Sequence, residues 1–276
     1  MQIVSVSSLK GGVGKSSVTL GLASAALADG VPTLVVDLDP HADATTGLGV
    51  HATSELNVGR VLARRSKPGA IRAVAVSSPW VTRETGDGGK RRLDVAPGSS
   101  ASSPLDRSTY RAADLSRLVR ALEGMAADYE LVLIDCPPNL NALTRMAWAA
   151  STKVLSVAEP SLFSVAGTQR TMTAIAHFER DSPRAVGSAG VVVNRVHPDA
   201  REHRFRVDEL NELFGPLLVA PVIPENQVWQ RAQGSAWPIH RWPGADAEDL
   251  ADRYTQILRG LLATGAPAEE HASAGE

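Results

Sequence analysis

A glycine-rich turn near the start of the chain constrains the fold more than any other feature. Residues 8–21 read SLKGGVGKSSVTLG; they follow the strand-like run IVSVS and lead into the helix-like run TLGLASAALA. A phosphate-binding loop of the form Gly-x-x-x-x-Gly-Lys-[Ser/Thr] requires a strand before it and a helix after it. The segment departs from that form only at the first position, where Leu9 stands in place of glycine. We therefore predict a phosphate site within a strand–loop–helix unit.

The residues of this loop match the needs of a bound polyphosphate. Gly11, Gly12 and Gly14 let the backbone curl with its N–H groups inward. The helix that starts near Lys15 directs its positive end at the anion. Lys15 should neutralise β- and γ-phosphate oxygens, and the Ser16 hydroxyl should ligate Mg²⁺. The loop thus predicts ATP and Mg²⁺ as the bound cofactors.

Short apolar runs alternate with longer helical patterns along the rest of the chain. Continuous apolar runs such as LVLID and GVVVN are typical of strands buried on both faces of a parallel sheet. The predicted strands are Ile3–Val6, Thr33–Asp37, Leu93–Ala96, Leu131–Asp135, Lys153–Ala158, Ala189–Val193 and Leu218–Val222. The predicted helices are Lys15–Ala28, Ala113–Ala127, Asn141–Ala150, Val165–Arg180, Phe205–Leu213 and Ala247–Ala263. We therefore predict an α/β fold with a doubly wound, mostly parallel sheet flanked by helices, the P-loop NTPase fold.

The bulk properties fit one globular domain inside the cell. The chain has 276 residues, a net charge of −2 and one cysteine, Cys136, which excludes a disulfide framework and any CxxC metal or cluster site. No apolar run reaches the ~20 residues of a membrane helix, and no signal peptide is recognised. We expect a cytoplasmic ATPase domain over residues 1–263, with an exposed loop or hairpin at 77–92 and a disordered tail at 264–276.

Acidic residues end two of the predicted strands. Asp37 and Asp39 lie in TLVVDLDP, and Asp135 ends the run YELVLID. The carboxyl ends of parallel strands form the ligand edge of such a sheet. Carboxylates there can hold hydrated Mg²⁺ and position an attacking water molecule. The predicted magnesium site therefore combines Ser16 with Asp37, Asp39 and Asp135.

The box KGGVGKSS resembles the deviant Walker A motif of the ParA/MinD superfamily, to which the nitrogenase iron protein also belongs. The resemblance runs from about residue 1 to residue 262. It implies a homodimer in the ATP state, in which Lys10 reaches across to the partner's phosphates, and it makes Lys10, Lys15 and Asp39 the catalytic residues. The nucleotide-binding residues that it implies in the loop are Lys10, Gly11, Gly12, Val13, Gly14, Lys15, Ser16 and Ser17.

Three further positions take expected roles from the same resemblance. Asn194 at the end of VVVN would read the adenine edge with its amide; the alternative is a turn-forming residue. Pro224 in PVIPENQ would wall the base. HADAT is similar to the KADST stretch of the nitrogenase iron protein, so Asp43 either joins the magnesium or water network or caps a helix.

DNA binding is less secure in the sequence, because net charge gives no global basic field. ParA-type partition ATPases, which the chain resembles, bind DNA nonspecifically through arginines, but Glu225 and Val228 stand at two of those positions here. Basic clusters remain at 60–67, at 90–92 and at 201–206. Such clusters are usually solvated faces. The last cluster, Arg201, Arg204 and Arg206, is the preferred candidate for a DNA contact, because it precedes a helix in the second half of the chain.

The resemblance implies a slow, partner-stimulated ATP hydrolase of chromosome or plasmid partition, with a ParB-like stimulator and possible nucleoid association. One alternative is an ATPase that positions a protein cargo or division machinery without DNA; another is a nucleotide-binding regulator with negligible hydrolysis. The membrane-bound division-site type lacks support because no terminal amphipathic helix is found, and the iron–sulfur type lacks its cysteines. Trp229, Trp237 and Trp242 either pack against the last helix or form a protein-docking surface.

Overall fold

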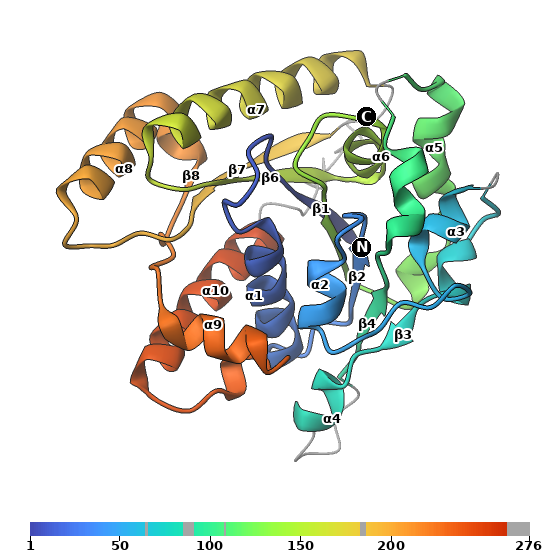
Figure 1. Cartoon of the computed structure of the whole chain (residues 1–276), viewed down its shortest axis with the longest axis horizontal. Coiled ribbons are helices and arrows are strands. Elements are labelled where there is room, and N and C mark those ends of the chain that lie inside the picture. Colours follow the sequence, from blue (N-terminus) through green and yellow to red (C-terminus); the bar gives the residue numbers. More distant parts are fainter. Residues whose placement is uncertain (64–65, 85–90, 108, 183–185, 264–276) are drawn as a thin grey trace, which may run out of the picture.

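A computed structural model describes residues 1–63, 66–84, 91–107, 109–182 and 186–263. Its centre is an eight-stranded sheet in the order β3-β4-β2-β5-β1-β6-β7-β8 (Figure 1). The strands are β1 Gln2–Ser7, β2 Thr33–Asp37, β3 Val76–Ser77, β4 Leu93–Ala96, β5 Leu131–Asp135, β6 Lys153–Ala158, β7 Gly187–Val193 and β8 Leu218–Val219. All neighbouring pairs are parallel except β3 and β4. The predicted P-loop NTPase fold is confirmed.

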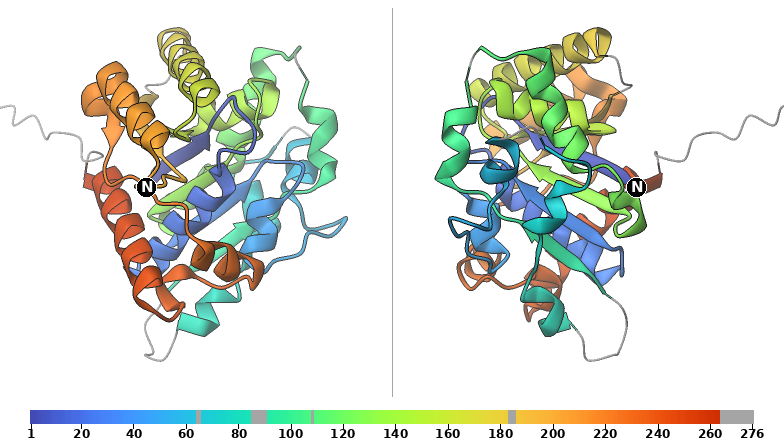
Figure 2. Two further views of the ribbon diagram at one scale, coloured as in Figure 1. Left: turned by 60° about the vertical axis from the view of Figure 1, so that its left-hand side comes forward. Right: turned by 90° about the vertical axis from the view of Figure 1, so that its right-hand side faces the viewer.

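Helices cover both faces of the sheet (Figures 1 and 2). They are α1 Lys15–Ala28, α2 Asp43–Gly47, α3 Val58–Ala63, α4 Trp80–Glu84, α5 Ala112–Ala121, α6 Ala142–Ala150, α7 Leu162–Asp181, α8 Arg201–Phe214, α9 Gln227–Gly234 and α10 Ala245–Ala263. Helices α1, α9 and α10 share one hydrophobic core with the sheet, and α3, α5, α6 and α7 share a second. A third, smaller core lies among β6, β7, α7 and α8. The tail at 264–276 lies outside the described residues.

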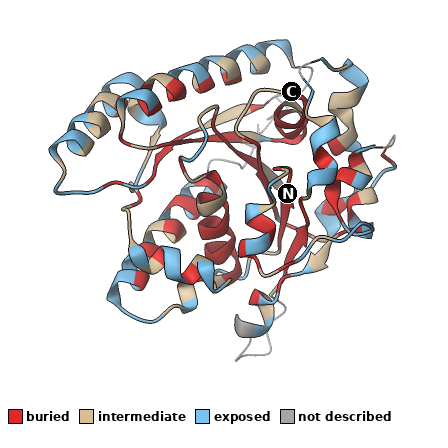
Figure 3. Cartoon of the chain, viewed as in Figure 1, coloured by how far each residue is buried: buried red, intermediate tan, exposed pale blue. Residues whose placement is uncertain are grey.

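The strand sequences show why hydrophobic cores form on both faces of the sheet. In β5, Leu131 and Leu133 face the core of α1 and α10, whereas Val132 and Ile134 face the core of α5 and α6. Side chains alternate between the two faces of a strand, so a continuous apolar run fills both cores at once. Figure 3 shows the central strands and α1 as buried almost throughout. The sheet is therefore a rigid base for whatever lies at its carboxyl edge.

The interpretation of residues 77–92 as an exposed loop or hairpin needs correction in part. The segment does join two antiparallel strands, β3 and β4. Its first part, however, folds into α4, and the side chain of Trp80 is fully buried in the core shared with α1 and α10. Residues 85–90 lie outside the described residues.

Replacing Trp80 with Ala should therefore lower the free energy of unfolding by about 3–5 kcal/mol, because removing a large aromatic side chain leaves a cavity in the closed core. The indole Nε1–H also donates a hydrogen bond to Ala236 O at 2.8 Å, which the variant loses. Urea denaturation measures the change. Thr82→Ala, on the exposed side of the same helix, should change the stability by less than about 0.5 kcal/mol. Equal stability of the two variants would contradict the burial of Trp80.

Several predicted boundaries differ from the observed ones for local reasons. The predicted strand Leu218–Val222 stops at Val219, because Pro221 has no amide hydrogen to continue the ladder. The predicted helix Ala113–Ala127 ends at Ala121, and Met125–Ala127 form a separate 3₁₀ turn. Helices α2, α3, α4 and α9 span only five to eight residues, too few for a helical hydrophobic period to be recognised.

Two of the three tryptophans considered above, Trp229 and Trp242, pack against the core of the last helix. Trp229 is buried, and its ring lies 5.6 Å from that of Tyr254 on α10, centroid to centroid. Trp242 is partly buried and packs against the same core, and Trp237 is also partly buried. In the described part of the chain, no helix is long and apolar enough to cross a membrane.

Candidate nucleotide-binding site

The glycine-rich loop joins β1 to α1 at the carboxyl edge of the sheet, as predicted. Gly12 has φ 80° and Gly14 has φ 92°, in the left-handed region that glycine tolerates. A Cβ atom on Gly14 would lie 2.2 Å from Asn194 Nδ2. Glycine is therefore required at position 14 both for the backbone turn and for the close approach of β7.

The sheet register brings the strand-end acids beneath the start of α1. Asp135 is the register neighbour of Asp37 across the β2–β5 pair. The Ser16 hydroxyl donates to Asp135 Oδ2 at 2.6 Å, and the Thr19 hydroxyl contacts Asp135 Oδ1 at 3.2 Å. Lys15 is only 6% exposed. The predicted residues Lys15, Ser16 and Asp135 thus meet at one place.

Asp37 is held by its own neighbours. Its Oδ2 accepts hydrogen bonds from Thr45 N at 2.8 Å and Thr45 Oγ1 at 2.7 Å, and its Oδ1 accepts one from Asp39 N at 3.1 Å. These bonds fold the segment after β2 back over the end of the strand. Asp37 therefore shapes the site, and it lies beside Asp135 in the sheet register.

Two buried carboxyls side by side are electrostatically unfavourable. Burial raises the pKa of both Asp37 and Asp135, and the charge of Asp135 raises the pKa of Asp37 further. A cation between the Ser16 hydroxyl and these oxygens would relieve that repulsion, so the hard oxygen donors fit Mg²⁺. Within the described ranges no three His, Cys, Asp or Glu residues form a metal site alone. Mg²⁺ usually takes one or two carboxylates and completes its coordination with phosphate and water.

Asp39 and Asp43 have different surroundings. Asp39 is 8% exposed, and its Oδ1 accepts a hydrogen bond from His41 N at 3.0 Å. Asp43 is the first residue of α2 and is exposed, and Ala42 rather than Asp43 is the N-cap. An acidic residue in the first turn stabilises a helix by its favourable interaction with the helix dipole. The structure thus places Asp43 at a helix start, but not as its capping residue.

Lys10 contacts its own subunit. Its Nζ donates to Glu159 Oε1, just past the end of β6, and to Ser161 Oγ at 3.2 Å. The two side chains are about one quarter exposed. Sequence reasoning missed Glu159, although an acid after an apolar strand was the signal that identified Asp37 and Asp135.

Asn194 lies at the site, but its amide is engaged with the loop rather than open. It is buried, and its Nδ2–H donates to Val13 O at 2.9 Å. One of the two N–H donors of its amide is therefore used within the chain in this structure. Pro224 is partly buried and pairs with Val196 in an isolated parallel bridge beside β7. The base-binding roles of both residues remain predictions.

The predicted DNA-contacting arginines share α8 with many acids. Arg206 donates to Glu202 Oε1 at 2.7 Å and to Glu209 Oε2 at 2.8 Å, so its charge is compensated locally. Arg204 and Arg201 are exposed. From the first basic cluster, Arg60 pairs with Glu55 at 2.7 Å.

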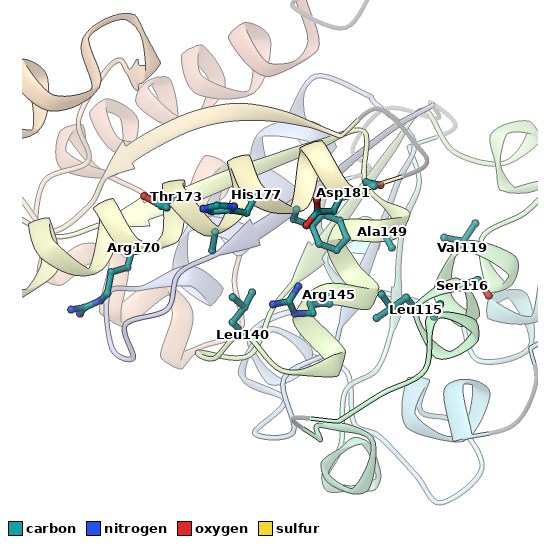
Figure 4. Close-up of a pocket in the computed structure, with 14 residues that line it drawn as sticks. Leu115, Ser116, Val119, Leu140, Arg145, Ala149, Arg170, Thr173, His177 and Asp181 are labelled. Atoms are coloured by element: carbon teal, nitrogen blue, oxygen red, sulfur yellow. The ribbon is translucent and has the colours of Figure 1, made fainter.

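A cavity of about 830 Å³ opens between α5, α6 and α7 (Figure 4). Leu115, Leu140 and Phe178 give it apolar walls, and Arg145 and Arg170 add positive charge. No predicted nucleotide-site residue lines it, so this cavity is separate from the phosphate loop.

Comparison with known proteins agrees with this geometry. The family described as "AAA domain" (AAA_31) matches residues 1–186. Chromosome partitioning protein ParA of Caulobacter vibrioides is 27% identical over 249 residues, covering 87% of this chain and 86% of that protein. Sporulation initiation inhibitor protein Soj of Bacillus subtilis is 25% identical over 240 residues, covering 86% of this chain and 90% of Soj.

A solved structure shares the whole architecture. An aspartate-to-alanine variant of Cyanothece McdA in complex with ATP superposes with a TM-score of 0.79 at 17% identity, covering 95% of this chain and 96% of that one. The family match spans residues 1–186, which is more than half of the chain. The chain belongs to the AAA-domain family and, within it, to the ParA/MinD type.

Proposed function

We propose that this protein is an ATP-dependent dimerising switch with slow ATP hydrolysis that a partner protein stimulates. The observation that carries the proposal is the gathering of Lys15, Ser16 and Asp135 at a glycine-rich loop that also holds a second lysine, Lys10. Carboxylates at strand ends beside a phosphate loop hold Mg²⁺ and position the attacking water in nucleotide hydrolysis. ATP and Mg²⁺ are the proposed cofactors, and the ATP-bound McdA structure supports the nucleotide.

Each residue has a definite part in this proposal. Lys15 and the loop N–H groups bind the phosphates, Ser16 and Asp135 hold the magnesium site, and Asp39 orients the attacking water molecule. When bound, Mg²⁺ neutralises charge on the phosphate oxygens. Asp37 keeps the segment after β2 in place through Thr45. Lys10 leaves Glu159 and contacts the phosphates of the partner subunit.

Chromosome or plasmid partition is the proposed cellular role, with nonspecific DNA binding by the ATP dimer, a ParB-like stimulator and a nucleoid-associated location. The similarity to ParA of Caulobacter vibrioides supports it. Arg201 and Arg204 are exposed on α8 and are the proposed DNA contacts. Their binding would rest on phosphate neutralisation and would weaken with salt.

The charge of α8 favours a second candidate, in which the same switch positions a protein cargo without DNA. The helix carries three arginines and four acids; the acids are Glu202, Asp208, Glu209 and Glu212. Its net charge is therefore −1, which repels a DNA backbone. Glu225 adds another negative charge near Arg195. The structural likeness to McdA is compatible with either candidate.

Binding to a long nonspecific DNA duplex separates the two candidates. The protein carries Asp39→Ala to hold the ATP dimer, and binding is measured with ATP, ADP or no nucleotide at about 50 and about 200 mM salt. We expect binding only with ATP, and weaker binding at the higher salt. Arg201→Ala and Arg204→Ala should reduce it. If a protein shown to be dimeric with ATP binds no DNA, the partition role fails and the cargo-positioning role stands.

The contact of Lys10 with Glu159 gives a separate prediction. Glu159→Gln removes the charge that holds Lys10 in its own subunit, so the ATP dimer should form about fivefold more tightly, the effect of one partly exposed ion pair per subunit. Sedimentation or mass photometry with ATP measures the dimer. Glu179→Gln, an exposed acid far along α7, is the matched control. A weaker dimer in Glu159→Gln would show that Glu159 supports the closed state instead.

A further inference from the structure

Two consecutive side chains just after β7 donate hydrogen bonds to two consecutive carbonyls of the phosphate loop. Asn194 Nδ2–H donates to Val13 O at 2.9 Å, and Arg195 Nη1–H donates to Gly12 O at 2.6 Å. The partners lie more than 180 residues apart in the sequence. Neither donor belongs to the phosphate-loop motif, so the loop is shaped in part by side chains from outside it.

These contacts fix the direction of the N–H groups of the loop. In a planar trans peptide, the carbonyl and the following N–H point in opposite directions. With Gly12 O and Val13 O turned toward β7, the N–H groups of Val13 and Gly14 turn away from β7. Successive N–H groups that point the same way make an anion-binding concavity. The two hydrogen bonds therefore hold the loop N–H groups in a phosphate-binding orientation without a bound ligand.

Arg195 is itself held in an unusual conformation. It is one of three non-glycine residues in the described ranges with positive φ, at 59°. The bridge of Val196 with Pro224, and the bond from Glu225 N to Val196 O at 3.0 Å, fix the backbone after it. Arg195 Nε also lies 3.6 Å from Glu225 Oε2. A bulky residue keeps such a conformation only where its surroundings impose it, and this occurs often at functional sites.

We propose that Asn194 and Arg195 are positioning residues that clamp the phosphate loop in its polyphosphate-binding form, and that Glu225 aims the guanidinium of Arg195. The inference rests on the proposed nucleotide-binding function and deepens it. It also gives a role to Glu225, which stands where partition proteins carry an arginine. The clamp acts on the phosphates and not on the base, so its ligand is the polyphosphate part of a nucleotide.

Calorimetric binding of ATP, ADP, inorganic pyrophosphate and AMP, each with Mg²⁺, tests the clamp. Arg195→Ala should weaken the binding of ATP, ADP and pyrophosphate by about tenfold, because the loop loses one good hydrogen bond. The affinity for AMP, which lacks the polyphosphate, should change by less than about twofold. Arg195→Lys should recover part of the loss, because an ammonium group still reaches a carbonyl. Glu225→Gln should give an intermediate loss. Arg120→Ala on α5 is the control for loss of an exposed arginine.

The outcomes separate the clamp from the proposed function. Unchanged pyrophosphate affinity in Arg195→Ala, with wild-type protein that binds ATP, overturns the clamp alone. An equal loss for AMP and ATP also overturns it, because the role would then lie with the base. Wild-type protein that binds none of the four ligands overturns the proposed function and the clamp together. If Arg195→Ala does not fold, Arg195→Lys and Glu225→Gln decide by the same ratio of pyrophosphate to AMP.

Discussion

Asp39→Ala should leave ATP binding within about threefold of the unchanged protein and lower its turnover by about 100-fold or more, the usual scale for loss of a group that positions a reactant. Asp39 lies just beyond β2 with its Oδ1 anchored by His41 N, and it makes none of the described contacts to the loop or to Ser16. Phosphate binding therefore survives its removal, whereas the attacking water molecule loses its orientation.

Phosphate release in single and multiple turnovers measures this effect, with fluorescent ATP titration as the measure of binding. Asp43→Asn is the matched control, because Asp43 is four residues away, acidic and exposed at the start of α2. It should keep the turnover of the unchanged protein. If the unchanged protein hydrolyses no ATP even though it binds it, the regulator with negligible hydrolysis becomes the better description. Equal turnover with and without Asp39 would remove this residue from the mechanism.

Lys15→Ala should lower the affinity for ATP by at least about 100-fold, because charge-assisted hydrogen bonds to the phosphates are lost from a buried position. Lys15 also stabilises the ionised form of Asp135, since its charge lowers the pKa of that carboxyl against the effect of burial. Its removal should therefore weaken magnesium binding as well.

Titration with labelled ATP and ADP, with circular dichroism to confirm folding, measures the loss. Lys10→Ala offers the informative comparison. Lys10 contacts Glu159 and not the site of its own subunit, so this variant should bind ATP as a monomer yet fail to form the ATP dimer. Should Lys15→Ala bind ATP with normal affinity, the phosphate loop would not be the nucleotide site.

The sequence predicted what depends on local pattern. Strands β2, β4, β5 and β6 have the predicted bounds, because continuous apolar runs ended by turn residues have few other solutions in an α/β chain. The meeting of Ser16 with Asp135 was predictable because a motif fixes the loop and strands end at a common edge.

The missed contacts depend on the order of the strands. Arg195 reaches Gly12, and Glu159 reaches Lys10, only because β6 and β7 follow β1 in the sheet. No local sequence pattern predicts the order of the strands in the sheet. Thr45, which holds Asp37, was missed because its helix α2 has five residues and no recognisable period.

The start of β1 and the end of α10 lie together, and this affects how the protein can be engineered. Gln2 Nε2, at the start of β1, donates to Leu262 O near the end of α10 at 2.8 Å. Lys153, at the start of β6, donates to Leu261 O at 3.0 Å. Both contacts are at the opposite end of the strands from the phosphate loop. A circular permutation that joins the end of α10 to the start of β1 by a short linker should therefore leave the nucleotide edge open for a partner subunit.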